Sequence, residues 1–188
     1  MKFPRATHLV ILVDAHPRHG WLLQAVEIRL REELAALEVE VKEEKTRVVD
    51  LTKGERFGFL GFDFRRVRSR TGAWRPHYTP KLKKRTALLR TLKAIFRRSR
   101  GQPVSEVIQQ INPILRGWVN YFAGGHASRC FTYIRDWVEK KVRRHLMRNA
   151  KRRGFGWRRW RRAWLYRTLG LFANYQVRYP GPTAVSAR

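Results

Sequence analysis

Apolar and polar positions follow different patterns in the two halves of the chain, and the first half mixes strands with one helix. The apolar run at 9–13 is typical of a buried strand, and apolar residues from 21 to 37 recur at the spacing of an amphipathic helix. We expect the run at 9–13 to pack under that helix. Further strands are predicted at 39–41, 46–51, 63–67 and 74–78, with a turn at 69–72.

The second half reads as helical throughout. Pro80 precedes an apolar stripe from 82 to 96, and a second stripe covers 104–122 with an expected kink or restart at Pro113. A third helix is predicted from Ser128, the expected N-cap, to residue 149. These segments predict a helical bundle after a small α+β unit.

A last helix is predicted after the glycines at 154 and 156. Trp157, Trp160 and Trp164 follow one another at three- and four-residue spacing, so we expect all three rings in the core. The end of the chain is rich in Pro, Gly and Ser. The predicted organisation is therefore an α+β unit at 1–79, a helical domain at 80–177 and a flexible tail at 178–188.

Charge separates the same two halves. The chain has 188 residues, a net charge of +28 and 43% hydrophobic residues, which is enough for a core. Residues 1–64 hold 10 Lys/Arg and 11 Asp/Glu, whereas residues 65–188 hold 32 Lys/Arg and 3 Asp/Glu. This asymmetry predicts a neutral scaffold joined to a module that binds a polyanion, either a nucleic acid or a membrane surface.

Other site chemistries find little support in the sequence. Cys130 is the single cysteine, which excludes an internal disulfide and a cysteine-based zinc site. His16 and His19 with Asp14 are interpreted as a polar turn before a helix. We see no glycine-rich phosphate loop, nucleophilic constellation, secretory signal or membrane-spanning stretch. We therefore expect a soluble, cytoplasmic protein with no metal, no cofactor and no membrane partner.

Nucleic acid is favoured because basic and aromatic residues alternate in the second half, as in "KRRGFGWRRWRRAW" at 151–164. The candidate RNA-binding residues are Lys81, Lys83, Lys84, Arg85, Arg97, Arg98, Arg100, Arg116, Arg143, Arg144, Lys151, Arg152, Arg153, Arg158, Arg159, Arg161 and Arg162.

The stretch "INPILRGWVNYF" at 111–122, followed by Tyr-Ile-Arg-Asp-Trp at 133–137 and a basic helix, resembles a known family. It is similar to the maturase-specific domain (domain X, or thumb) of group II intron reverse transcriptases. "LEVEVKEEKTRVVDL" resembles the end of the polymerase palm in that family, and "FGFLGF" at 57–62 resembles its primer-grip hairpin. The resemblance extends from about residue 5 to residue 178.

This resemblance implies a partial palm followed by an all-α thumb. In the family the thumb binds intron RNA, promotes its folding into the spliceable form and holds template-primer. By position, Arg116 matches the family's Arg-Gly-Trp motif, Lys45 its palm lysine and residues 59–62 its primer grip.

One motif departs from the family. Its palm strand is entered through Tyr-Ala-Asp-Asp, whose aspartates hold Mg²⁺ with a third from an earlier strand. Arg5, Ala6, Thr7 and His8 stand in those four places, and the earlier strand and the fingers are not found. Threonine and neutral histidine are poor substitutes for anionic oxygen ligands. No catalytic residue is therefore assigned, and we do not expect reverse transcription by this chain alone.

The leading hypothesis is a non-catalytic maturase-type protein that binds structured group II intron RNA and assists its folding and splicing. A second hypothesis is a C-terminal subunit of a split reverse transcriptase whose N-terminal fragment supplies the fingers and catalytic aspartates. A degenerate remnant of a mobile element and a general RNA- or ribosome-binding protein are the other two alternatives.

Overall fold

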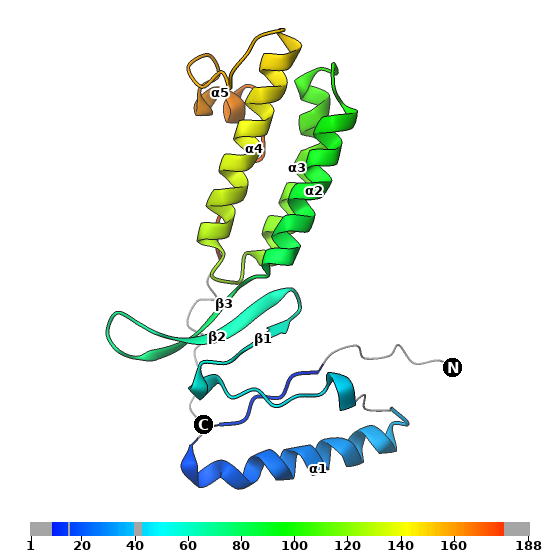
Figure 1. Ribbon diagram of the computed structural model, residues 1–188, viewed down its shortest axis with the longest axis vertical. Helices are drawn as coiled ribbons and strands as arrows, with labels where there is room; N and C mark the ends of the chain where they lie inside the picture. Colours follow the sequence, from blue (N-terminus) through cyan, green and yellow to red (C-terminus); the bar gives the residue numbers. More distant parts are fainter. Residues whose placement is uncertain (1–8, 15, 40–42, 179–188) are drawn as a thin grey trace, which may run out of the picture. The chain divides into compact units, whose positions relative to one another are not determined.

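The computed structural model describes residues 9–14, 16–39 and 43–178, without the side chain of Lys45. The chain divides into two units, one made of residues 1–60 with 64–76 and the other of residues 61–63 with 77–188. Along the chain, one long helix comes first, then three antiparallel strands, then a run of helices (Figure 1). This order confirms the predicted α+β class, a small sheet followed by helices.

Helix α1 spans Gly20–Ala36 and confirms the helix predicted from the apolar spacing. The 3₁₀ turn η1, Pro17–His19, leads into it, and His19 Nδ1 lies 3.0 Å from Asp14 Oδ2, as expected for a polar turn. At the other end the N–H of Val39 bonds to Leu34 O at 2.9 Å around Glu38, whose φ is +54°. This arrangement is a Schellman motif, which provides hydrogen-bond donors for carbonyls at the end of the helix that have no partner within it.

The strands predicted at 9–13 and 46–51 are wrong. Residues 9–13 have irregular backbone with Leu12 78% exposed, and residues 46–50 are irregular before the 3₁₀ turn η3, Leu51–Lys53. An apolar run becomes a strand only where a neighbouring strand takes its backbone hydrogen bonds. Among the described residues the sheet begins at Arg56, so neither segment pairs with it. Residues 40 and 41 of the strand predicted at 39–41 lie outside the described residues, as do Arg5 to His8.

The sheet has the order β1-β2-β3, formed by Arg56–Phe59, Phe62–Arg68 and Trp74–Pro80. These bounds confirm the extended stretches predicted at 63–67 and 74–78. The "FGFLGF" segment forms the first hairpin, because Leu60 (φ +44°) and Gly61 (φ +81°) adopt the left-handed conformations of a two-residue hairpin turn.

Three long helices form the body of the second unit: α2 (Leu82–Arg98), α3 (Val104–Phe122) and α4 (Ser128–Asn149). They confirm the three predicted amphipathic helices. Their apolar stripes meet in one core with fully buried side chains, including Leu92, Ile111, Leu115, Ile134, Val138 and Val142.

Two details of these helices differ from the prediction. α3 is continuous through Pro113, so the helix does not restart there, and a kink at this position stays a prediction. The carbonyl that Pro113 leaves without a donor belongs to the exposed residue Gln109, so water can replace the lost bond. Ser128 is the first residue of α4 and not its cap, because the cap position holds Ala127, which is fully buried and makes no side-chain bond.

The last helix is also shorter than predicted. α5 spans only Arg162–Arg167, and Trp157 lies before it with 51% of its surface exposed, so its expected place in the core is wrong. Gly154 and Gly156 have φ of +94° and +68°, and this turn of the backbone leaves Trp157 outside the core. Trp160 and Trp164 pack against the core as expected.

The segment after α5 returns along the bundle and is tied to α3. Asn112 Nδ2 donates to Gly170 O at 2.8 Å, and its Oδ1 accepts the N–H of Phe172 at 2.9 Å. Farther on, the N–H of Arg178 bonds to Ala123 O at 2.8 Å. Asn112 therefore replaces the backbone partners that this irregular segment would otherwise lack.

Candidate nucleic-acid interface

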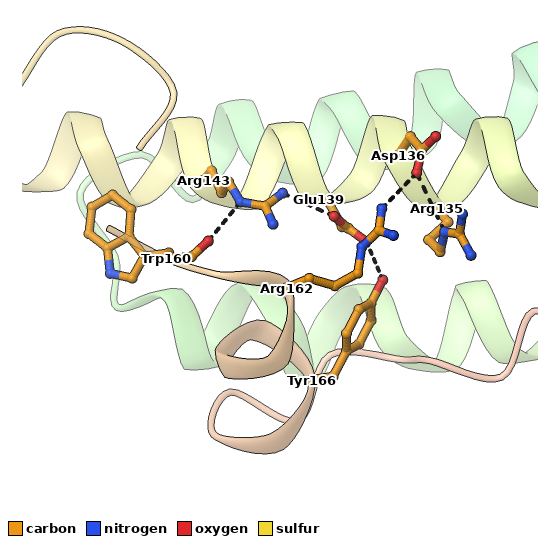
Figure 2. Close-up of polar contacts among 7 residues, drawn as sticks. All are labelled: Arg135, Asp136, Glu139, Arg143, Trp160, Arg162 and Tyr166. Carbon is orange, nitrogen blue, oxygen red and sulfur yellow. Dashed lines mark hydrogen bonds and ion pairs between the residues drawn. The ribbon is translucent and has the colours of Figure 1, made fainter. Parts of the chain in front are cut away.

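A buried carboxylate joins α4 to α5 and its preceding loop. Glu139 is 1% exposed and accepts hydrogen bonds from Tyr166 Oη at 2.6 Å and Arg143 Nη1 at 3.1 Å, with Arg162 Nε at 2.8 Å (Figure 2). Burial alone would raise the pKa of Glu139, but the bonds from Tyr166, Arg143 and Arg162 outweigh it and lower the pKa. Glu139 is thus a fully partnered anion at the α4–α5 contact.

Two candidate RNA-binding residues belong to this network. Arg143 is 2% exposed, and besides Glu139 it donates to Trp160 O at 2.9 Å, while the ring of Trp157 covers its guanidinium at 4.3 Å. Arg162 also bonds Asp136 Oδ1 at 3.1 Å. Both arginines therefore balance protein carboxylates, and Arg143 is not accessible to a ligand.

The side of α4 opposite Glu139 carries cations beside aromatic rings, and it runs along α2. We call it the α2–α4 face and define it by residues Arg85, Lys93, Tyr133, Trp137, Lys140, Lys141, Arg144, Arg148 and Phe155. On α4 these residues recur at three- and four-residue spacing from 133 to 148, which places them on one side of the helix. Asp136 and Glu139 lie on the side that faces α5 (Figure 2).

Four of the cations on this face lie over aromatic rings: Arg85, Lys140, Lys141 and Arg144. The guanidinium carbon of Arg85 on α2 is 4.3 Å from the ring centre of Tyr133 on α4, and Lys141 Nζ is 5.1 Å from that of Trp137. Such contacts hold long side chains in position without neutralising their charge. The cations therefore stay available to an external anion.

A hollow of about 180 Å³ opens on this face and is lined by Trp137, Lys140, Lys141, Arg144 and Phe155. Phe155 comes from the loop after α4. This loop begins with a Schellman motif, in which the N–H of Arg152 donates to Met147 O at 2.8 Å and Lys151 has a φ of +53°. The Lys140 ammonium and the Arg144 guanidinium lie 4.8 and 5.6 Å from the centre of the Phe155 ring. Three cations and two rings thus share one small space.

Positively charged side chains from both α2 and α4 surround Lys141. Burial lowers the pKa of Lys141, and the neighbouring charges of Arg144, Lys93, Arg148 and Lys140 lower it further. Each of these groups repels the others unless an anion lies between them. The α2–α4 face therefore concentrates positive charge, and it combines cations with aromatic rings, the two kinds of side chain that contact phosphates and bases in nucleic-acid complexes.

Residues 85–164 match the family model described as "Group II intron, maturase-specific domain". Residues 85–164 are therefore similar to a maturase-specific domain. The match confirms the resemblance seen in the motif at 111–122, and it covers almost all of α2, all of α3 and α4, and α5 as far as Trp164. It supports a role related to group II intron maturases. No curated protein matches the chain.

The predicted RNA-binding residues lie within residues 85–164 or close to them. They occur in three structural environments. Lys81 and Arg85 are half-buried near the start of α2, and Arg143 and Arg162 belong to the Glu139 network. The exposed candidates are Lys83, Lys84, Arg97, Arg98, Arg100, Arg116, Arg144, Lys151, Arg152, Arg153, Arg158, Arg159 and Arg161. Of all candidates, only Arg85 and Arg144 lie on the α2–α4 face.

Sequence reasoning missed most of that face. Lys93, Lys140, Lys141, Arg148, Trp137 and Phe155 were not among the candidates. The periodic recurrence of Tyr133, Trp137 and Lys141 was a signal that could have found the stripe on α4. Nothing in the sequence places Phe155 or Lys93 beside it, because both come from other segments.

Two absences hold for the part of the chain that the structure describes. None of their His, Cys, Asp and Glu side chains form a group of three or more that could hold a metal ion. None of the described helices combines the length and the apolar content needed to cross a bilayer. Lys45 lies in the 3₁₀ turn Glu43–Lys45, outside the matched residues.

Proposed function

We propose that the protein binds structured group II intron RNA through its maturase-specific domain and assists the folding and splicing of that RNA without catalysing the reaction itself. The observation that carries the proposal is the α2–α4 face, where cations from two helices cluster beside an aromatic ring from a loop, with no carboxylate among the residues that define the face. The match at 85–164 supports intron RNA as the partner.

The physical mechanism is charge neutralisation. Close approach of RNA helices is opposed by repulsion between their phosphates, and Lys and Arg side chains reduce it while releasing counterions. The rigid three-helix core holds these side chains in one array, so that the protein stabilises one arrangement of RNA helices over others. The ribozyme's own metal ions would then carry out the cleavage and ligation steps.

The α2–α4 face and the exposed arginines of the loop before α5 are the proposed contact surface. The loop contributes Arg158, Arg159 and Arg161, which are exposed and have no carboxylate partner among the described ion pairs. Arg143 is left out of this surface because it is buried.

Binding as a function of salt tests the electrostatic part. If about eight phosphates are contacted, log K should fall with a slope of about −6 to −7 against log salt concentration. A charge-neutralising change on the face, such as Arg144→Gln with Arg148→Gln, should make this slope shallower by about 1 to 2. Lys53→Gln, an exposed lysine in the other unit, is the control and should leave it unchanged.

Splicing at low Mg²⁺ concentration tests the functional part. The protein should increase the fraction of a group II intron transcript that splices where the RNA alone is inactive. Bulk transfer RNA should compete poorly for this effect. Complete competition by transfer RNA would indicate general RNA binding, and a salt slope near zero would contradict the electrostatic proposal.

A further inference from the structure

The hollow beside Phe155 combines two kinds of contact in a space too small for a large ligand. Its lining residues supply three cations and two aromatic rings and include no carboxylate. Its volume of about 180 Å³ is below the range of about 300–1,000 Å³ that holds drug-sized ligands. The chemistry therefore fits a small, flat group that carries negative charge.

We propose that this hollow holds one unpaired nucleotide of the bound RNA, with its phosphate against Lys140, Lys141 and Arg144 and its base against the ring of Phe155. The proposal rests on the proposed function, because the RNA must first bind to the domain. In a continuous duplex the faces of each base are covered by its neighbours, so only a bulged or looped nucleotide can present a face to an aromatic side chain. The hollow would thus add a preference for unpaired positions to binding that is otherwise electrostatic.

The placement of Phe155 supports a built site. The residue lies between Gly154 and Gly156, both in left-handed conformations that side chains rarely adopt. A Cβ on Gly156 would also come within 2.5 Å of the Trp160 ring, so this turn requires glycine. The backbone therefore fixes the ring over α4, where Lys140 and Arg144 already flank it.

The cations of the hollow are held close together before any ligand arrives. Lys141 has Lys140, Arg144 and Arg148 on its own helix and Lys93 on α2 as neighbours, and all four carry the same charge. A phosphate among them would relieve this repulsion, whereas an uncharged ligand would not. This arrangement selects an anionic group over a neutral aromatic one.

The test compares two RNA hairpins that differ only in one bulged nucleotide, using the 188-residue chain. The wild-type protein should bind the bulged hairpin about five- to 100-fold more tightly, as expected for one base stacked on an aromatic side chain. Phe155→Ala and Phe155→Leu should both abolish this preference, by weakening the binding of the bulged hairpin more than the binding of the paired one. Tyr121→Ala, which removes an exposed ring on α3, is the matched control and should keep the preference.

Three further readouts separate the possible results. Lys141→Gln should weaken binding of the bulged hairpin while leaving the Tm of the free protein unchanged or raised, because it removes a repelled charge. A ribonucleoside monophosphate should reduce the preference at concentrations where inorganic phosphate does not. A 4-thiouridine at the bulge should crosslink to the segment that contains Phe155.

Failure of this inference and failure of the proposed function give different results. Equal binding of the two hairpins by the wild-type protein, or equal competition by inorganic phosphate, would overturn the nucleotide site while RNA binding stands. A parallel loss of affinity for both hairpins in Phe155→Leu would also overturn it, because the ring would then serve binding in general. If neither hairpin binds and no intron transcript binds, the proposed function itself fails.

Discussion

Tyr166 Oη donates a hydrogen bond of 2.6 Å to Glu139 Oε1, a carboxylate that is 1% exposed. The two residues are 27 positions apart in the chain, so the bond ties α5 to the middle of α4. Arg143 and Arg162 complete the shell around the same carboxylate (Figure 2). Removing one partner from a buried ion pair leaves an uncompensated charge, so we expect substitutions in this network to be strongly destabilising.

Removal of the buried carboxylate should destabilise the domain much more than removal of an exposed one. We expect Glu139→Ala to lower the free energy of unfolding by about 3–5 kcal/mol, because it leaves Arg143 buried without its anionic partner. Asp136→Ala is the matched control, since Asp136 shares Arg162 but is about half exposed, and we expect about 0–1 kcal/mol. Urea unfolding of both variants measures the difference. Equal costs would contradict the central role of Glu139.

The free energy of unfolding should decrease at both low and high pH. We expect each decrease to depend on a different residue of the Glu139–Tyr166 pair. The pKa of Glu139 is lowered in the folded state, so its contribution is present above the ordinary value of 4.5 and is lost as the pH falls through the lowered pKa. Burial and the bond to Glu139 raise the pKa of Tyr166 above its ordinary value of 10.0, so its contribution is lost as the pH rises beyond that value. Urea midpoints from pH 3 to pH 11 should therefore decline at both ends.

Substitutions of Glu139 and Tyr166 show which residue causes the loss of stability at each end of the pH range, the acid limb and the alkaline limb of the curve. Glu139→Gln should flatten the acid limb, and Tyr166→Phe should flatten the alkaline limb. Tyr166→Phe should also cost about 1.5–3 kcal/mol at neutral pH, because it removes a hydrogen bond to a charged group. An alkaline limb that is unchanged in Tyr166→Phe would show that other groups produce it.

Asn112 should control the order of the segment after α5. Its side chain makes both backbone bonds to Gly170 and Phe172, and an unsatisfied partner costs about 1–3 kcal/mol. We expect Asn112→Ala to speed amide hydrogen exchange at Phe172 and to lower stability by about that amount. Asn120→Ala, an exposed residue of the same helix, is the control and should change neither. Unchanged exchange at Phe172 would mean that packing alone holds the segment.

The arginines around α5 should divide into two classes. Replacing Arg158, Arg159 and Arg161 together by Ala should weaken RNA binding and leave the Tm unchanged, since all three are exposed. Arg162→Ala should lower the Tm, because Arg162 bonds both Glu139 and Asp136. Binding assays with thermal unfolding of each variant make the comparison. A stable Arg162→Ala protein that binds RNA poorly would place Arg162 in the interface instead.

The bounds of α2, α3 and α4 were predictable from the sequence to within a few residues, because each of these helices buries an apolar stripe against the others. The strands at 9–13 and 46–51 were not predictable in the same way. A strand depends on a partner that supplies backbone hydrogen bonds, and an apolar run contains no information about that partner. Trp157 shows the same limit for helices, since two glycine conformations two residues apart moved it out of the core.

By itself, the sequence determined the fold class, the concentration of positive charge in the second half and the motif that identifies the maturase-specific domain. These are properties of composition and of spacing along one element, and each segment carries them independently of the others. Only the tertiary structure decided which cations are free and which are partnered. Arg143 and Arg144 are neighbours in the sequence, but their side chains leave α4 in different directions, one into the Glu139 network and one into the hollow beside Phe155.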